Sequence, residues 1–319
     1  MMFKTYEIPE LLVFKILDNE EILSDIKQFY PNLVESNKEP EYCIDRQIVE
    51  NLDNYHYLIN QKPLHPFRNC IYYNQTLDET HQIVAYAPAN DQTIEHAIIR
   101  NGKEILIQYK KDNSKVFTRT VRELIFRKFL EKGYFPLHAS ATKFNGNIIL
   151  NFGPKGCGKS TVLFEKIIEE GHQPVSNDIT LVGKENNVWN AIGTQYTLSF
   201  DSSLFGNDGS SKIRFTPYEF SKVFHTVWSE KGQVNQISYL SLDKNMQYSE
   251  SALTSEQLFE KLNLYGKDHG FYFDDYLEIN NLVPIFDYEA LSMDLTAVNE
   301  KGNIFNRSRW FYWIVILIL

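Results

Sequence analysis

The chain has 319 residues, a formal net charge of −9 and a hydrophobic content of 43%. This composition supplies enough apolar side chains for two folded domains and excludes a chain that is disordered throughout. The acidic balance, without a strongly basic stripe, excludes a general nucleic-acid-binding protein.

The three cysteines, Cys43, Cys70 and Cys157, are odd in number and irregularly spaced. They therefore predict neither a disulfide framework nor a zinc site, and they suit a reducing compartment. Charged and apolar residues are mixed from the start of the chain, unlike a secretory signal. We therefore expect a cytoplasmic protein.

Residues 1–118 are predicted to form a smaller α+β domain of open role, since no catalytic constellation is recognisable in them. The expected elements are strands at 11–17 and 81–87, a helix at 20–30, and a hairpin of 93–99 and 103–109.

A second domain is predicted at residues 119–300. Apolar residues recur at helical spacing between Thr118 and Glu131, and Gly133 follows as a stop signal. We expect this helix to lead into the second domain.

A hairpin is predicted next. An Asn-Gly pair separates the strand-like runs 136–144 and 147–152, and this pair favours a two-residue type I′ turn. With that register, His138 falls opposite Gly153. Its imidazole is interpreted as a group that titrates near neutral pH beside the following loop, or as a structural histidine at a strand end.

The most informative motif is the phosphate-binding loop pattern G-x-x-x-x-G-K-[ST], which the chain matches without a mismatch. Glycines let backbone N–H groups converge on phosphate oxygens, and a helix predicted at 159–170 favours anions at its N-terminus. ATP is the expected ligand, with Lys159 on the β- and γ-phosphates and Ser160 on Mg²⁺. The predicted nucleotide-binding residues are Gly153, Pro154, Lys155, Gly156, Cys157, Gly158, Lys159, Ser160 and Thr161.

The helix N-terminus favours a lowered thiol pKa for Cys157. We nevertheless interpret Cys157 as a small loop residue rather than as a nucleophile. Beyond the helix, residues 171–182 are predicted to form a strand with Asp178 within it. An acidic group about twenty residues beyond a phosphate loop can contact Mg²⁺ or accept a hydroxyl proton.

Residues 301–319 form an apolar C-terminal tail, with ten consecutive apolar residues from Trp310 to Leu319. This run has about half the length that spans a bilayer. It is interpreted as a final buried strand, as an anchor that makes weak membrane contact, or as a tail outside the fold.

Three segments together resemble the HPr kinase/phosphorylase superfamily, with phosphoenolpyruvate carboxykinase as a more distant relation. They are Leu137–Ala141 in the predicted hairpin, the phosphate loop, and Gly171–Val182. The likeness covers roughly residues 119–245. The antiparallel hairpin predicts a mixed sheet around the phosphate loop, and the resemblance implies an α/β fold of the same kind, ATP and Mg²⁺ as ligands, and assembly as a homo-oligomer.

The resemblance also implies catalytic roles for His138 and Lys159 and a metal-binding role for Ser160. The family usually carries two adjacent aspartates after the helix, the first acting as a base, where this chain has Asn177 and Asp178. Because an amide cannot accept the proton, Asp178 or His138 takes that role, or the protein binds ATP with little turnover. The Glu-containing loop of true HPr kinases is also absent, which argues against HPr itself as the acceptor.

The sequence therefore predicts an ATP-dependent kinase that transfers the γ-phosphoryl group to a hydroxyl of a peptide, a protein or a small molecule. His138, Lys159 and Asp178 are the predicted catalytic residues, and Ser160 and Asp178 the predicted Mg²⁺ ligands. The alternative is a nucleotide-responsive binding module with little or no turnover.

Overall fold

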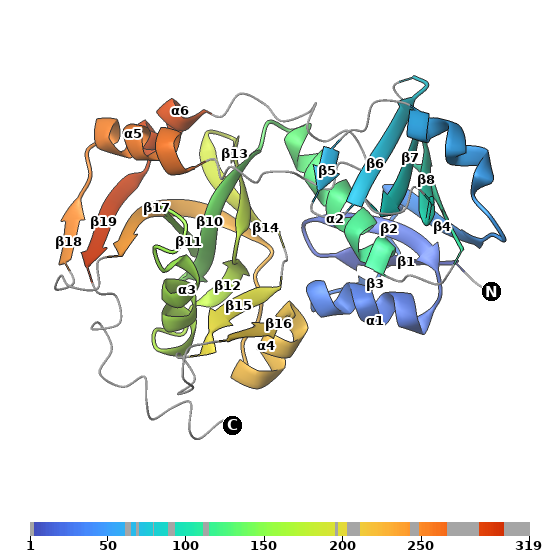
Figure 1. Cartoon of the computed structure of the whole chain (residues 1–319). Helices are drawn as coiled ribbons and strands as arrows, with labels where there is room; N and C mark the ends of the chain where they lie inside the picture. The colour runs from blue at the N-terminus through green and yellow to red at the C-terminus, as the bar shows by residue number, and fades with distance from the viewer. Residues whose placement is uncertain are drawn as a thin grey trace. The chain divides into compact units, whose positions relative to one another are not determined.

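The computed structural model describes residues 3–60, 65–67, 70–78, 80–88, 93–110, 115–194, 197–202, 211–242, 249–266 and 287–302. The chain divides into two compact units (Figure 1), which are described separately. The described residues of the first unit lie within Met1–Glu131, and those of the second lie within Lys132–His269 and Pro284–Leu319.

The division between the units differs from the predicted boundary at residue 118. Helix α2 (Lys115–Leu130) groups with the first unit, where it packs against α1 (Glu20–Phe29). Its apolar spacing predicted the helix correctly, but helical spacing does not indicate which sheet a helix will cover.

The first unit contains a nine-stranded sheet in the order β3-β1-β2-β4-β9-β8-β7-β6-β5. Its strands are β1 (Phe3–Ile8), β2 (Leu12–Leu17), β3 (Val34–Glu35), β4 (Tyr42–Ile48), β5 (His65–Phe67), β6 (Cys70–Thr76), β7 (His81–Pro88), β8 (His96–Asn101) and β9 (Glu104–Tyr109). The predicted hairpin is confirmed as β8–β9, although Asn101 still pairs with Glu104, so the turn consists of residues 102–103 instead of the expected 100–102.

Helix α1 was predicted at 20–30 and is observed at Glu20–Phe29. The Asn19 side chain accepts a hydrogen bond from the backbone N–H of Ile22, which caps the helix N-terminus. Ile22 and Ile26 are buried on one face, so α1 is an amphipathic helix, and it packs against α2. A 3₁₀ helix, η1 (Asp53–Asn60), contributes Leu58 to an apolar cluster of this unit.

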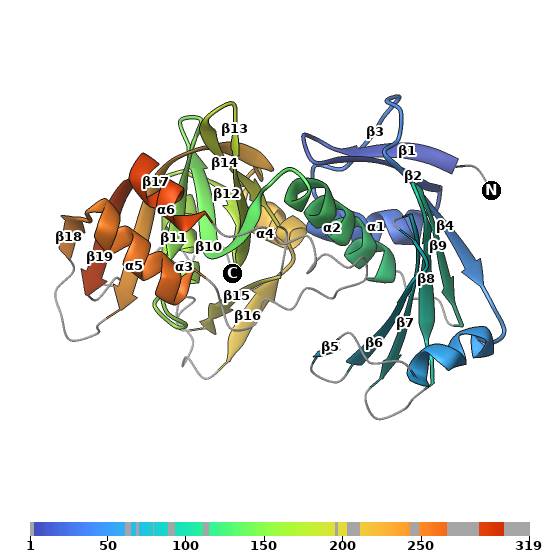
Figure 2. The same cartoon turned by 90° about the horizontal axis from the view of Figure 1, so that it is seen from above.

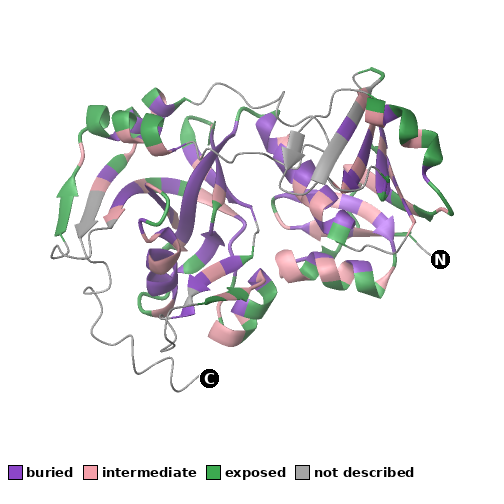
Figure 3. Cartoon of the chain, in the orientation of Figure 1, coloured by how far each residue is buried: buried purple, intermediate pink, exposed green. Residues whose placement is uncertain are grey.

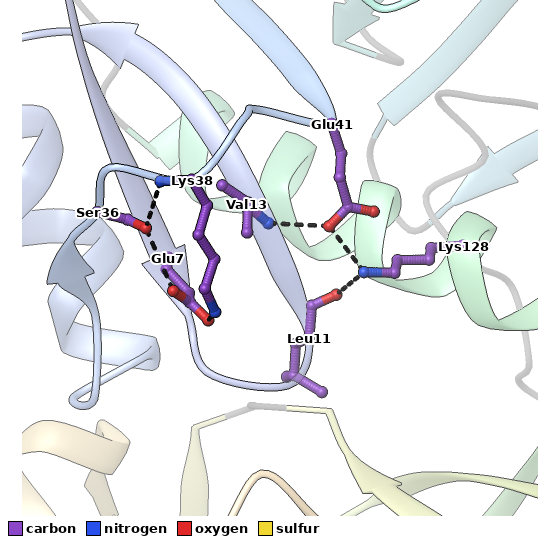
Figure 4. A network of polar contacts seen from close by, with 7 residues as sticks. All are labelled: Glu7, Leu11, Val13, Ser36, Lys38, Glu41 and Lys128. Atoms are coloured by element: carbon purple, nitrogen blue, oxygen red, sulfur yellow. Dashed lines mark hydrogen bonds and ion pairs between the residues drawn. The ribbon is translucent and has the colours of Figure 1, made fainter.

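Lys128 links α2 to the first strands of the sheet (Figure 4). Its Nζ donates to the carbonyl of Leu11 at 2.8 Å and to Glu41 Oε1 at 2.7 Å. The same Glu41 oxygen accepts from the backbone N–H of Val13 at 3.1 Å. Lys128 therefore binds the turn between β1 and β2 directly. It also binds the Glu41 carboxylate, which in turn accepts a hydrogen bond from a backbone N–H of β2.

We expect Lys128→Met to lower the local unfolding free energy of α2 and β2 by about 1–2 kcal/mol, because the Leu11 carbonyl loses this donor and the Glu41 carboxylate loses its cationic partner. Amide hydrogen exchange of these two elements measures this effect. Lys38→Met is the matched control, since the Lys38–Glu7 pair involves a lysine side chain that is 65% exposed. It is expected to cost less than about 0.5 kcal/mol. Equal effects of the two changes would contradict the assignment.

The second unit contains an eight-stranded mixed sheet. The strands β11, β10, β13, β14 and β17 form a closed circuit of pairings, because β17 pairs with both β14 and β11. The pairs β11–β17 and β17–β19 are parallel, and the pairs of β10 are antiparallel. Its strands are β10 (Phe135–Phe144), β11 (Asn147–Phe152), β12 (Gln173–Ser176), β13 (Ile179–Glu185), β14 (Val188–Gly193), β17 (Lys231–Leu242), β18 (Ser249–Ala252) and β19 (Thr296–Gly302). The expected α/β fold with a mixed sheet is thus observed.

Alternation along β10 assigns its two faces. Leu137, Ala139 and Ala141 join a core cluster with residues of α5 (Ser255–Tyr265) and α6 (Tyr288–Asp294). His138, Ser140 and Thr142 therefore face the other side of the strand, toward α3 (Lys159–Ile168). Both faces are covered, and β10 is buried over most of its length (Figure 3).

An aromatic cluster covers the outer side of α3. Phe164 of this helix packs against Phe200 of β15 (Leu198–Asp201) and against Phe220 of α4 (Pro217–Phe224). Strand β16 (Lys212–Phe215) pairs with β15 to form a separate two-stranded ribbon. Figure 2 shows this ribbon and α4 on the same unit as α3. The cluster anchors the helix whose first residues belong to the phosphate loop.

The predicted apolar tail, 301–319, lies outside the described residues except for residues 301 and 302. Within the described ranges, none of the helices combines the length and the apolar character that crossing a bilayer requires.

Candidate phosphate-binding site

The hairpin that leads to the phosphate loop has the predicted register. Phe144 pairs with Asn147, and Ala139 pairs with Phe152. Asn145 and Gly146 both have positive φ, at 49° and 84°, as a type I′ turn requires. His138 directly precedes Ala139, and Gly153 directly follows Phe152. The register therefore brings His138 to the level of Gly153.

The loop follows β11 and ends in α3. Its glycines adopt backbone conformations that suit glycine, with φ of 151° at Gly153, 79° at Gly156 and 97° at Gly158. Gly158 caps α3 without any side-chain hydrogen bond. The N–H groups of the first helical turn have no intrahelical acceptor, so this N-terminus is suited to bind an anion.

Gly153 packs directly against the neighbouring parallel strand. A Cβ atom at this position would lie 2.4 Å from the Leu240 carbonyl oxygen and 2.9 Å from Cys157 Sγ. Only glycine fits this close approach of the loop to β17. The sheet therefore determines where the loop begins.

Lys159 lies over the loop rather than in solvent. Its side chain is buried, and Nζ donates to the carbonyls of Gly153 at 3.0 Å and Pro154 at 3.3 Å. Lys155 and Gly156 are exposed at the tip of the loop, while Pro154, Ser160 and Thr161 are half-buried. The loop thus presents backbone groups and one ammonium group together, which fits the charge of a polyphosphate.

Cys157 points into the protein. It packs with Val162 and Leu240 in a small apolar cluster beneath the loop. Burial raises the pKa of its thiol, and the nearby Lys159 ammonium only partly opposes this effect. The expected lowering of this pKa at the helix N-terminus is therefore wrong, because desolvation by residues far away in sequence outweighs it. The interpretation of Cys157 as a loop packing residue agrees with its burial.

The raised thiol pKa leads to a prediction about chemical reactivity. At pH 7.5 iodoacetamide is expected to modify folded Cys157 at least about tenfold more slowly than the same cysteine in urea, because the thiolate is scarce and buried. Peptide mass spectrometry over time measures both rates. Equal rates in the folded and unfolded protein would show that the loop cysteine is accessible.

His138 and Asp178 are brought together. His138 Nε2 lies 3.3 Å from Asp178 Oδ1, with the imidazole mostly buried and the carboxylate 54% exposed. The backbone N–H of His138 donates to the carbonyl of Gly266, which fixes the start of β10 beside the end of α5. A half-exposed carboxylate paired with an imidazole is a chemically plausible proton acceptor.

Asp178 was expected within a continuous strand over residues 171–182, but the structure interrupts that strand. Asp178 lies with Asn177 in a bend between β12 and β13, and both of these strands pair with β10. The ladder of β10 with β12 shifts register between Ala141, which pairs with Ser176, and Thr142, which pairs with Pro174, so Val175 is an extra residue on β12 shortly before the bend. Such an irregularity re-aims side chains. It depends on the partner strand, so apolar periodicity within 171–182 does not reveal it.

Sequence reasoning assigned no structural role to two polar residues near the loop. Ser140 Oγ donates to the Lys159 carbonyl at 3.3 Å, and Asn151 is fully buried in the strand before Gly153. A signal for Asn151 was present, since it interrupts an apolar run. Within the described ranges, no group of three or more His, Cys, Asp or Glu side chains is arranged to hold a metal ion.

The chain matches no protein-family model and no curated protein. Among solved structures it is similar to the Hpr(Ser) kinase/phosphatase from Coxiella burnetii, with 14% sequence identity over 54% of this chain and 87% of that chain, at a TM-score of 0.29. This is a weak likeness at the level of the fold.

Proposed function

We propose that this protein is an ATP-dependent kinase that transfers the γ-phosphoryl group to a hydroxyl of a peptide, a protein or a small molecule. One observation carries the proposal: the loop with the phosphate-binding pattern connects β11, the strand next to the one that bears His138, to a helix N-terminus without a side-chain cap, and His138 contacts Asp178. Phosphoryl transfer depends mainly on positioning and electrostatics, and this arrangement supplies both.

The proposed roles follow from the contacts. The backbone from Gly153 to Lys159 cradles the phosphates, and the Lys159 ammonium offsets negative charge that develops on the transferred group. The acceptor oxygen forms a bond to the γ-phosphorus, the bond to the bridging oxygen breaks, and ADP leaves. The hydroxyl proton passes to the His138–Asp178 pair.

The residues present fit Mg²⁺, the ion that usually accompanies ATP. Ser160 is half-buried in the first turn of α3, and Asp178 offers an exposed carboxylate. Mg²⁺ typically takes one or two protein oxygens together with substrate phosphates and water, so a larger cluster of ligands is not required. When bound, the ion would neutralise charge on the phosphates.

The rival proposal is a nucleotide-responsive binding module with little turnover. Asn177 favours the binding module, because a neutral amide stands directly before Asp178. The Oδ1 atom of Asn177 is buried and has no hydrogen-bond partner among the described residues. An amide at this position cannot serve as a base. The two proposals differ in one observable, the formation of ADP together with a phosphorylated acceptor.

The experiment is mass spectrometry of acceptors after incubation with Mg·ATP and a cell extract. Wild type is expected to add one phosphoryl group to a specific peptide or metabolite, and Asp178→Asn is expected to lose this activity, because it removes the carboxylate beside His138. A folded Asp178→Asn protein with normal turnover would rule out the proposed proton acceptor. Binding of ATP without a phosphorylated product would favour the binding module.

A further inference from the structure

Asn151 is an unusual residue at its position. It belongs to β11, is 0% exposed, and lies two residues before the phosphate loop. Neither its Oδ1 nor its Nδ2 has a hydrogen-bond partner among the residues that the structure describes. Buried amides without partners destabilise a fold, so each one in a native protein calls for an explanation.

The neighbours of Asn151 are also polar. It pairs with Ser140 on β10 and with Ser238 on β17, and both serines are 0% exposed. Side chains at paired positions of neighbouring strands lie on the same face of the sheet. The three residues therefore form a buried polar row across β10, β11 and β17.

This row lies beneath the start of α3. Ser140 Oγ donates to the carbonyl of Lys159, the first residue of that helix, at 3.3 Å. The same lysine holds the loop carbonyls of Gly153 and Pro154 through its Nζ. A substitution in the polar row can thus change the position of Lys159, on which the proposed function relies most.

We propose that Asn151 is a positioning residue of the phosphate loop, which acts through a buried water molecule shared with Ser140 and Ser238. The amide offers one acceptor and two donors, and each hydroxyl offers both functions, so the row provides the two to four polar partners that a buried water needs. The water would orient the Ser140 hydroxyl onto the Lys159 carbonyl and so fix the first turn of α3.

The test combines stability with local dynamics in Asn151→Leu, a change that keeps the approximate volume and removes the polar groups. Melting temperature is expected to change little, because the amide is lost together with the water that it binds and an apolar side chain of similar volume replaces it. Amide hydrogen exchange of residues 153–162 is nevertheless expected to become about tenfold faster, because the start of α3 loses its support. Ser140→Ala, which removes the hydrogen bond to Lys159 directly, is expected to accelerate the same amides.

The control is Ser202→Ala, which removes another buried hydroxyl that has no partner among the described residues. It is expected to leave exchange of residues 153–162 unchanged. Unchanged exchange in Asn151→Leu, or an equal acceleration in Ser202→Ala, would overturn the inference. So would a lower melting temperature of Asn151→Leu if Ser140→Ala leaves the loop amides unchanged.

A second measurement, the affinity for Mg·ATP, rests on the proposed function. Asn151→Leu is expected to bind Mg·ATP about tenfold more weakly than wild type. Hydrogen exchange is measured without nucleotide, so the two ideas can fail separately. Failure of wild type to bind Mg·ATP would overturn the proposed function alone, whereas equal affinities of wild type and Asn151→Leu would overturn the positioning role.

Discussion

Lys159→Ala is expected to lower phosphoryl transfer by about two to three orders of magnitude while the protein stays folded. The lost ammonium group donates to the Gly153 and Pro154 carbonyls, so its position over the loop is already fixed by the protein. In the proposed reaction, a positive charge held in advance at this place would stabilise the charge that develops on the phosphoryl group without reorganisation.

The stability cost of Lys159→Ala is expected to be about 1 kcal/mol, because two carbonyls lose one shared donor. Far-UV circular dichroism and urea unfolding verify the fold, and ADP release measures turnover. Lys222→Ala is the matched control, since it removes an exposed cation of the same unit from α4. Equal turnover of wild type and a folded Lys159→Ala protein would refute the proposed mechanism.

Gly153→Ala is expected to destabilise the second unit by about 3 kcal/mol and to abolish high-affinity nucleotide binding. The new Cβ would meet the Leu240 carbonyl oxygen at 2.4 Å, and this partner is backbone that cannot rotate away. Overpacking of this kind typically costs about 1–3 kcal/mol, and the positive φ adds about 1–2 kcal/mol. The loop would have to move away from β17, and its N–H groups would lose their convergence.

Gly171→Ala separates backbone strain from the clash. Gly171 has a φ of 72°, and nothing lies within 4 Å of its ideal Cβ position. We expect a loss of about 1 kcal/mol in urea unfolding and unchanged ATP affinity. A Gly153→Ala protein that resembles Gly171→Ala in both measurements would contradict the close packing of the loop on β17.

Local sequence signals predicted the features that depend on neighbouring residues. The Asn-Gly turn fixed a register that the structure confirms, and this register brings His138 to the level of Gly153. The mixed sheet followed from the same antiparallel hairpin. A two-residue turn leaves a strand pair little freedom, which explains why this part of the site could be predicted.

Features that depend on distant residues were missed. The bend at Asp178 separates β12 from β13, which both pair with β10, and nothing within residues 171–182 encodes this shared partner or the register shift in the β10–β12 ladder. The raised pKa of Cys157 arises from burial, and the thiol packs with Val162 and with Leu240, which is far along the chain. The assignment of α2 to the first unit likewise depends on its contact with α1.

The role of Asn151 was not predicted, because it also depends on residues that are distant in the sequence. A polar residue in a buried strand is visible in the sequence, but its significance comes from Ser140 and Ser238 on the two adjacent strands. One of these strands follows about ninety residues later, so only the tertiary structure reveals the polar row.

The most direct test of the central claim is a calorimetric titration of the wild-type protein with ATP, ADP and AMP in the presence of Mg²⁺. A loop that holds the β- and γ-phosphates through Lys159 and the N-terminus of α3 is expected to bind ATP and ADP at least about tenfold more tightly than AMP. Absence of ATP binding, or equal affinity for ATP and AMP, would contradict the assignment of residues 153–161 as a polyphosphate-binding site.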